Sequence, residues 1–314
     1  MTVGIVGAGF VGAACAKSML LRGTAERIVL NDIAKEKAQG LANDLSHAEL
    51  LCPPTRIEAG SMSLMEDAKV VVVTAGINER SGDAIDRNDP RGRLLLLPRN
   101  TEVYQDVLPR IVEVAPNAVI LVVTDPPDAL ADVARRLVPS ANVVSAGTFL
   151  DSLRFRYQIG RGLGCHPASV EADVLGEHGT SQVYVWSGAR VGGERALALA
   201  EAKGLDPIEF RDRVEAAVLH ANIEIIEGTG ASQHGIGVVT ARLAEAILRD
   251  EGLVAPVGTY QARYGVTLSL PSVIDASGVA EVLTPTLEEE ESAALEASAK
   301  ALRQALEGVS HLLS

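Results

Sequence analysis

The sequence contains few cysteines and few aromatic residues. Its three cysteines, Cys15, Cys52 and Cys165, are far apart and form no CxxC pair. An odd number at such spacings argues against a disulfide framework and against a zinc site, and it fits a reducing compartment. We therefore expect a cytoplasmic protein that carries no metal. Aromatic residues make up only 3% of the chain, so its cores must be built from Val, Leu, Ile and Ala.

Long apolar runs and positive charge are also lacking. No apolar run reaches the roughly 18 residues of a membrane-spanning helix, so we expect none. Lysine and arginine number 28 against 41 aspartates and glutamates, which gives a net charge of −13. Nucleic acids and anionic membranes bind basic surfaces, so both are disfavoured as partners. A small anionic substrate is compatible, because a few local arginines outweigh distant charge.

The first 32 residues have the pattern of a βαβ unit. A short apolar strand at Thr2–Val6 leads directly into "GAGFVG" at Gly7–Gly12, which opens a predicted helix ending near Gly23. A second strand follows at Arg27–Asp32. A glycine-rich turn between a strand and a helix is typical of dinucleotide-binding folds.

Each glycine of this turn has a physical role that suits a dinucleotide. Gly7 permits the tight turn, Gly9 lets the backbone approach a pyrophosphate at the helix N-terminus, and Gly12 allows close helix–strand packing. Asp32 lies 20 residues after Gly12. Its carboxylate can accept both ribose hydroxyls of the adenosine and would repel a 2′-phosphate, which favours NAD over NADP.

Three further Val-rich strands continue the alternation at 69–76, 118–125 and 142–147. Continuous apolar strands separated by helices indicate a parallel sheet covered on both faces. We predict an α/β chain with a doubly wound Rossmann NAD-binding domain over residues 1–146, followed by an α+β catalytic domain over residues 147–314. Ligands bind beyond the carboxyl ends of such strands. The predicted cofactor-binding residues are Gly7, Gly9, Phe10, Val11, Gly12, Asp32, Thr74, Ala75, Gly76 and Val123.

The second half contains charged residues beside apolar ones. Asp151 and Arg154 are three residues apart on one face of a predicted helix that begins at Phe149. They could form a surface ion pair, or the arginine could clamp a carboxylate while the aspartate fixes the tautomer of a histidine. The candidate histidine is His178 in "GEHG", which could equally be a satisfied core residue.

The motifs resemble those of the L-lactate/L-malate dehydrogenase family over nearly the whole chain. The matching segments are "GAGFVG", "LANDLSHA", "TAG", "RLLLLPRN", "LDSLRFRY" and "LGEHGTSQVYVWSG". The last two resemble the lactate branch more than the malate branch. The segment "LANDLSHA" resembles the dimer-forming helix of the family, so the resemblance implies a homodimer or a homotetramer.

The resemblance also implies roles for individual residues. His178 matches the catalytic proton donor, Asp151 the aspartate that orients it, and Arg154 the arginine that clamps the substrate carboxylate. Arg93 matches the arginine on a mobile loop that polarises the carbonyl. Ser232 falls where the family usually has a threonine that touches the substrate carboxylate.

Two departures from the family pattern leave the substrate open. Sixteen residues separate Gly76 from Arg93, a longer loop than is usual. Arg87 in this loop resembles, by its spacing, the arginine that selects malate, although the loop could also be a solvated, self-paired segment. In "VTDPPD" the third residue is Asp125, where the family has asparagine. An ionised carboxylate cannot donate a hydrogen bond. Asp125 is therefore protonated, faces water, or meets a positive group on the substrate or product.

These features predict an NAD-dependent L-2-hydroxy-acid dehydrogenase, most like L-lactate dehydrogenase, that acts on a small 2-oxo or 2-hydroxy acid. A malate dehydrogenase, or an enzyme for a bulkier or polar 2-oxo acid, is the main alternative. A non-catalytic NAD-binding protein and an NAD-dependent glycosidase are more remote alternatives.

Overall fold

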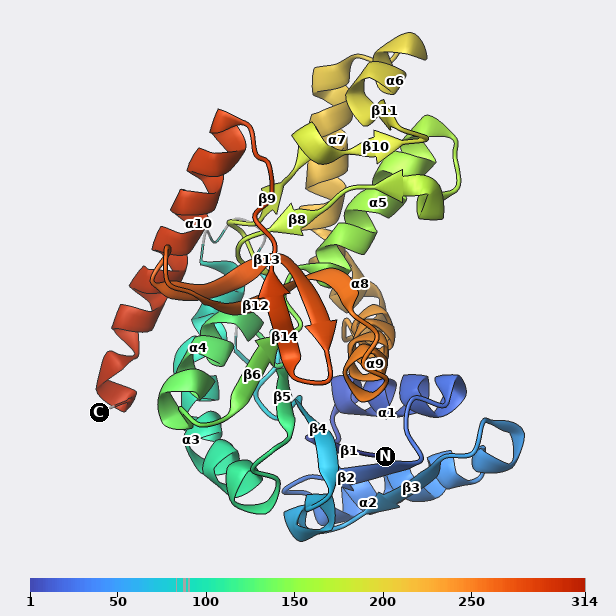
Figure 1. Cartoon of the computed structure of the whole chain (residues 1–314), viewed down its shortest axis with the longest axis vertical. Coiled ribbons are helices and arrows are strands. Elements are labelled where there is room, and N and C mark those ends of the chain that lie inside the picture. Colours follow the sequence, from blue (N-terminus) through green and yellow to red (C-terminus); the bar gives the residue numbers. More distant parts are fainter. Residues whose placement is uncertain (83, 87–88, 90, 314) are drawn as a thin grey trace.

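The computed structural model describes residues 1–82, 84–86, 89 and 91–313. The chain folds around one large mixed sheet, with a helical region above it (Figure 1). The strands are β1 (Thr2–Val6), β2 (Arg27–Asn31), β3 (Arg56–Ala59), β4 (Ala68–Val73), β5 (Val119–Val122), β6 (Asn142–Ser145), β7 (Val170–Glu171), β8 (Val174–Leu175), β9 (Val183–Tyr184), β10 (Arg190–Val191), β11 (Glu194–Arg195), β12 (Leu253–Gln261), β13 (Val266–Asp275) and β14 (Gly278–Val282). The α-helices are α1 (Phe10–Arg22), α2 (Lys35–Ser46), α3 (Leu97–Val114), α4 (Pro127–Leu137), α5 (Phe149–Leu163), α6 (Ala196–Ala202), α7 (Pro207–Leu219), α8 (Ala221–Thr229), α9 (His234–Leu248) and α10 (Glu289–Gly308).

The sheet has nine strands in the order β14-β13-β12-β6-β5-β4-β1-β2-β3. The strands β1 to β6 are parallel to one another, in the doubly wound order expected for a Rossmann domain. The strands β12 to β14 are antiparallel and extend the same sheet through one pairing, Gly258 with Ser145. The sequence patterns did not indicate β3 or this continuation of the sheet.

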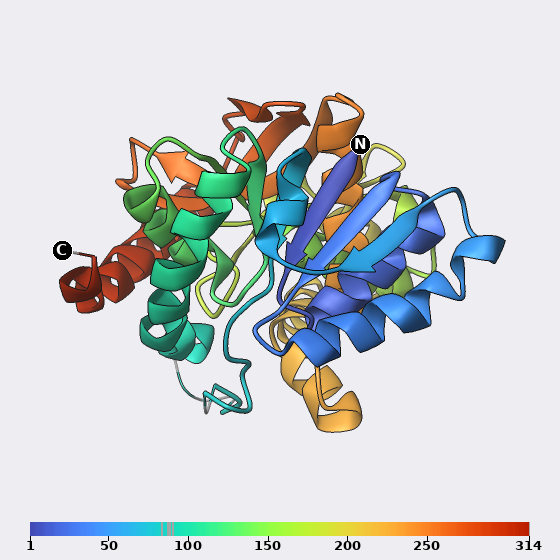
Figure 2. The same cartoon turned by 90° about the horizontal axis from the view of Figure 1, so that it is seen from below.

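Helices lie on both faces of the parallel strands (Figure 2), and an apolar layer covers each face. Side chains alternate along β4, so that Val71 and Val73 belong to one layer, and Val70 and Val72 to the other. The first layer also contains residues of α3, α4 and α10. The second contains residues of α1 and, from the distant C-terminal half, of α9. The position of the predicted domain boundary at residues 146–147 stays a prediction.

The glycine turn forms as the sequence predicts. Gly7 has a φ of +106°, which L side chains rarely adopt. A Cβ on Gly12 would lie 1.9 Å from the Gly7 carbonyl oxygen, so only glycine lets α1 start this close to β1. The helix ends at Arg22, and the left-handed Gly23 caps it.

The upper region in Figure 1 has its own apolar core around α5. Phe155 and Trp186 pack edge to face with ring centroids 4.8 Å apart, and Phe210 of α7 completes this aromatic contact. This core fixes the direction of α5 and therefore the place of the charged residues in its first two turns. Within the described part of the chain, no helix is both long enough and apolar enough to cross a membrane.

Candidate active site

A cavity of about 270 Å³ lies beyond the carboxyl ends of the parallel strands. The glycine turn borders one end of it, through Gly9 and Phe10. His178 and Arg154 from the second half of the chain border the other. The cavity is therefore shared by the nucleotide-binding half and the half that carries the charged residues, which is where ligands bind in open α/β sheets.

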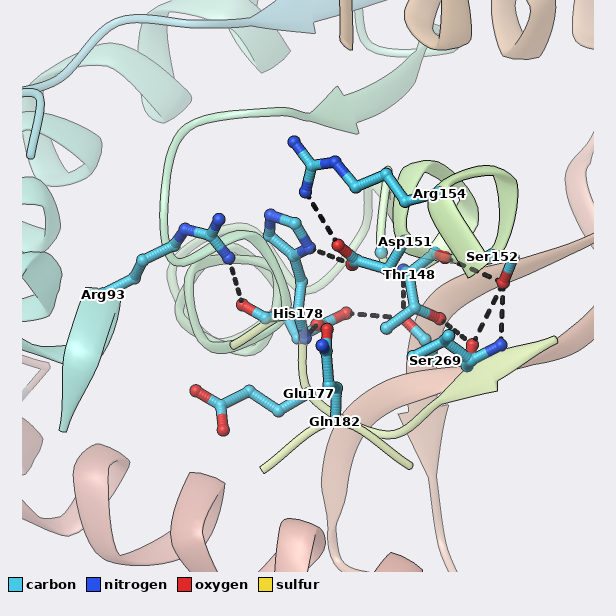
Figure 3. Close-up of polar contacts among 12 residues, drawn as sticks. Arg93, Thr148, Asp151, Ser152, Arg154, Glu177, His178, Gln182 and Ser269 are labelled. Atoms are coloured by element: carbon cyan, nitrogen blue, oxygen red, sulfur yellow. Dashed lines mark hydrogen bonds and ion pairs between the residues drawn. The ribbon is translucent and has the colours of Figure 1, made fainter. Parts of the chain in front are cut away.

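His178 follows β8 and is held at one ring nitrogen by Asp151 (Figure 3). The aspartate lies in the first turn of α5 and is 1% exposed. A hydrogen bond from Nδ1 to a carboxylate leaves Nε2 as the ring nitrogen available to a ligand. The histidine also lines the cavity, so its side chain borders space that a ligand could occupy.

The negative charge of Asp151 is retained in this buried position. Burial on its own raises the pKa of this carboxyl, but the charges and hydrogen bonds of His178 and Arg154 outweigh that effect and bring the pKa down to about 2. The ionised carboxylate orients the imidazole through its bond to Nδ1.

Arg154 lies one turn further along α5 and donates from Nη1 to Asp151 at 3.0 Å. Its side chain is 13% exposed and borders the cavity. A guanidinium has five N–H groups in a planar fork, so the bond to Asp151 leaves donors for a second carboxylate.

Arg93 approaches the same histidine from the segment that precedes α3. Its Nη1 lies 3.4 Å from the His178 carbonyl oxygen, and its Nε lies 3.4 Å from Oδ2 of Asp125. Burial lowers the pKa of this guanidinium, but Asp125, Asp151, Glu79 and Glu177 together raise it above its ordinary value. Arg93 is therefore a buried cation surrounded by carboxyl groups.

Asp125 faces the centre of the site, and its side chain is 21% exposed. Oδ1 lies 3.7 Å from His178 Nε2. Burial raises the pKa of Asp125 to about 6, with Glu79 raising it further while Arg93 and His178 oppose the rise. Of the interpretations left open by the sequence, a carboxyl that faces water does not match this position.

The glycine turn has the features that a pyrophosphate requires. A Cβ on Gly9 would meet no atom within 4 Å, so the backbone there borders open space. Helix α1 begins at this glycine without a side-chain cap from the described residues and without an acidic residue in its first turn. Its first N–H groups can therefore bind an anion. Asp32 holds the turn by accepting from Ala8 N at 2.6 Å.

Comparisons with known proteins agree with this geometry. Residues 1–144 match the family model described as lactate/malate dehydrogenase, NAD binding domain, and residues 148–313 match the corresponding alpha/beta C-terminal domain. The chain belongs to the lactate/malate dehydrogenase family. This confirms the resemblance and the fold class inferred from the sequence.

The relatives match over almost their full length. The L-lactate dehydrogenase of Thermus aquaticus is 44% identical, over 97% of this chain and 98% of the relative. That of Deinococcus radiodurans is 40% identical, over 96% and 97%. Among solved structures, a lactate dehydrogenase enzyme from a Medee basin deep-sea metagenome library has a TM-score of 0.89 at 34% identity, covering 98% of each chain.

Most of the residues expected from the family lie at one cavity. The cavity lining includes, among the predicted site residues, Gly9, Phe10, Val11, Thr74, Gly76, Val123, Asp125, Arg154, His178 and Ser232. Gly7 and Gly12 shape the turn itself, and Ala75 accepts from the Thr124 hydroxyl at 2.9 Å through its carbonyl oxygen. Arg87, the candidate for malate selection, lies outside the described residues.

Sequence reasoning missed several polar residues that shape the site of this family member. Asp128 is 1% exposed and accepts from the His178 backbone N–H at 2.8 Å, so it positions the loop that carries His178. The signal was the second acidic residue of "VTDPPD". Asn100 of α3 donates to the Asp125 carbonyl oxygen at 2.7 Å. Glu79 and Asn222 line the cavity and are hydrogen-bonded to each other.

Proposed function

We propose that the chain catalyses the reversible reduction of a 2-oxo acid to an L-2-hydroxy acid with NADH, in the manner of an L-lactate dehydrogenase. The supporting observation is that His178, held by Asp151, and Arg154 line the cavity that the glycine turn borders, while Arg93 donates to the His178 carbonyl oxygen. Proton transfer, carboxylate binding and dinucleotide binding thus converge on one site.

Each charged residue would have a distinct task. His178, through Nε2, would give a proton to the carbonyl oxygen in reduction and take it back in oxidation. Asp151 would stabilise the charged imidazole. Arg154 would hold the substrate carboxylate, and Arg93 would stabilise the negative charge that develops on the carbonyl oxygen. When bound, NADH would supply the hydride to carbon 2.

The finer expectations from the sequence stay predictions. These are NAD rather than NADP as the cofactor, self-association as a homodimer or homotetramer, and a cytoplasmic location. The carboxylate of Asp32 at the end of β2 supports the preference for NAD, because it would repel a 2′-phosphate.

Steady-state oxidation of NADH with a panel of 2-oxo acids, including pyruvate and oxaloacetate, tests the proposal. Saturable turnover with at least one 2-oxo acid is expected. NADH binding without turnover of any panel member would instead favour a non-catalytic NAD-binding protein. Turnover of oxaloacetate in preference to monocarboxylic 2-oxo acids would favour malate dehydrogenase.

A further inference from the structure

The part of the cavity beyond His178 is lined by acceptor groups. Glu79 follows β4, and its Oε1 accepts from Asn222 Nδ2 of α8 at 2.9 Å. Glu79 is also near enough to Asp125, which follows β5, to raise the pKa of that carboxyl. The three side chains come from three separate elements and line one cavity. One of the two N–H groups of Asn222 is engaged by Glu79, and the oxygens of Glu79, Asp125 and the Asn222 amide are the acceptors on this wall.

Glu79 and Asp125 form the acidic wall of the cavity, and hydrogen bonds to the backbone behind it hold it in place. Asn100 is fully buried, and it accepts from Ile77 N at 2.7 Å while donating to the Asp125 carbonyl oxygen at 2.7 Å. One side chain therefore ties the segment that carries Glu79 to the segment that carries Asp125. These hydrogen bonds fix the two backbone segments that carry the carboxyls.

The cations around the site are already matched by other carboxylates. Arg154 pairs with Asp151 at 3.0 Å, and Arg93 lies 3.4 Å from Asp125. Among the described residues, Glu79 accepts from an amide and forms no ion pair. The binding of a substrate carboxylate at Arg154 adds a further negative charge. A substrate with a neutral or anionic side chain would leave Arg93 to balance the carboxyls of both Asp125 and Glu79.

Arg80 also lines the cavity. Its Nη2 is directed to the Ile226 carbonyl oxygen of α8 at 3.4 Å, and the residue is exposed. Burial and Glu79 raise the pKa of Asp125 to about 6, although Arg93 and His178 oppose the rise.

We propose that this site selects 2-oxo acids whose side chain ends in a cationic, hydrogen-bond-donating group, which Asp125 and Glu79 bind together. The proposal rests on the function proposed above and names its substrate class. A guanidinium is the best match, because its planar fork can donate to two carboxylates at once. Glu79 and Asp125 are then the specificity-determining residues, and Asn222 positions Glu79.

Two substrates of nearly equal shape test the proposal. We would measure kcat/KM with NADH for 2-oxo-5-guanidinopentanoate and for 2-oxo-5-ureidopentanoate, which differ in the charge of the terminal group. A charge-assisted hydrogen bond in a partly dry site is worth about tenfold to a hundredfold in binding. We expect the unmodified protein to prefer the guanidino substrate by at least about tenfold, mainly through a lower KM.

Variants assign the preference to the acidic wall. Glu79→Gln and Asp125→Asn should each bring the ratio for the two substrates close to one, while Glu79→Asp should retain part of it. Glu201→Gln, a matched change on the exposed face of α6, should leave the ratio unchanged. Tryptophan fluorescence quenching by NADH and the thermal unfolding midpoint check that each variant is folded and binds the cofactor.

The outcomes separate this proposal from the function on which it rests. Turnover of pyruvate with equal kcat/KM for the guanidino and ureido substrates would overturn the charge selection and leave the dehydrogenase assignment standing. A preference that persists in both Glu79→Gln and Asp125→Asn would also overturn it. If folded protein that binds NADH reduces no 2-oxo acid, both proposals fail.

Discussion

His178 keeps one orientation because Asp151 accepts from Nδ1 while Asp128 accepts from the backbone N–H of the same residue at 2.8 Å. Both carboxylates are almost fully buried. The ring is therefore fixed by its own hydrogen bond, and the loop is fixed by a separate one. This separation allows the chemical role of the ring to be tested without loss of the loop conformation.

Replacing His178 with asparagine should lower kcat for 2-oxo acid reduction by about a hundredfold to ten-thousandfold, the usual contribution of general acid–base catalysis. NADH binding should be unchanged, because the glycine turn is untouched. Stopped-flow turnover and fluorescence titration with NADH measure the two effects. The matched control is His166→Asn, because His166 is exposed and lies outside the cavity. Near-normal turnover of the His178 variant would refute the assigned role.

Asp125 should make pyruvate reduction depend on pH. Its pKa is about 6 in the folded protein, so the carboxyl gains a proton and loses its charge as the pH falls through that value. An ionised carboxylate about 5 Å from the developing alkoxide costs about 3 kcal/mol at an effective dielectric constant near 20, or about a hundredfold in rate. Reduction of pyruvate should therefore be faster at pH 5.5 than at pH 7.5.

The Asp125→Asn variant isolates this effect from the other groups that titrate or carry charge nearby, which are His178, Arg93 and Glu79. It should raise kcat/KM for pyruvate at neutral pH and flatten the profile near pH 6. The measurement is kcat/KM against pH for both proteins, since contributions common to the two cancel in the ratio. Superimposable profiles would show that Asp125 carries no charge that the reaction senses.

At the scale of single elements, the glycine turn contributes separately to packing and to ligand binding. Gly12 is required by packing, because a Cβ there would lie 1.9 Å from the Gly7 carbonyl oxygen. Gly9 is surrounded by open space, so glycine at that position favours the approach of a ligand. The two positions can be distinguished by the same small substitution.

Gly12→Ala should displace the start of α1, lowering both the thermal unfolding midpoint and the affinity for NADH. Gly9→Ala should leave the unfolding midpoint nearly unchanged and weaken NADH binding by about tenfold or more, because the added methyl occupies the space of the pyrophosphate. Differential scanning fluorimetry without cofactor and calorimetric titration with NADH measure the two quantities. Equal destabilisation by both substitutions would contradict the division of roles.

The elements that the sequence predicted well are those with local signals. The turn at Gly7–Gly12, the Val-rich strands and the start of α5 at Phe149 all form as expected. Strand β3 is short and has only one buried side chain, Ile57, so its pattern is weak. The roles of His178 and Arg93 followed from the family resemblance, since no local pattern brings residues 85 positions apart together.

The contacts that shape the substrate end of the cavity could not be read from the sequence. Glu79 and Asn222 are 143 residues apart and meet only because α8 packs over the segment after β4. The spacing of Arg87 to Arg93 resembles that of a malate-selecting arginine, but the long loop makes this spacing an unreliable guide. The departure at Asp125 did indicate an altered site, because a residue that cannot donate stood where a donor was expected.

At the scale of the whole molecule, the two halves of the chain share their packing. Helix α9 of the second half lies against α1 of the first, and a Cβ on Gly237 would come within 2.7 Å of the Ala14 backbone. Arg22 at the end of α1 donates from Nε and Nη2 to the carboxylate of Glu245 in α9, at 2.7 and 2.6 Å. Thr24 donates to the same carboxylate at 3.0 Å. These bonds join the two halves at the C-terminal ends of α1 and α9, whereas the cavity lies at the N-terminal ends of the same helices.

Replacing Arg22 with alanine should destabilise the protein through the carboxylate that it leaves behind. Glu245 is only 2% exposed, so the variant retains a buried charge with fewer partners. The Arg22 side chain is 40% exposed, and solvent reduces the effect to about 1–2 kcal/mol, or a few degrees in the unfolding midpoint at pH 7. Arg110→Ala, which removes a surface pair with Asp106, is the matched control and should change stability by less than about 0.5 kcal/mol.

The pH dependence of the Arg22→Ala effect identifies the carboxylate as its source. Burial raises the pKa of Glu245, but the bonds from Arg22 and Thr24 outweigh burial, so the folded-state pKa is below its ordinary value. A depressed carboxyl pKa stabilises the fold above the unfolded-state pKa of about 4.3, and that contribution is lost as the pH falls through the folded-state value. The difference in unfolding midpoint between the unmodified protein and the variant should therefore be full at pH 7 and shrink as the pH falls below about 4. Scanning calorimetry at both pH values measures it, and a difference that stays constant with pH would mean that Arg22 acts by packing its alkyl chain and not by its charge.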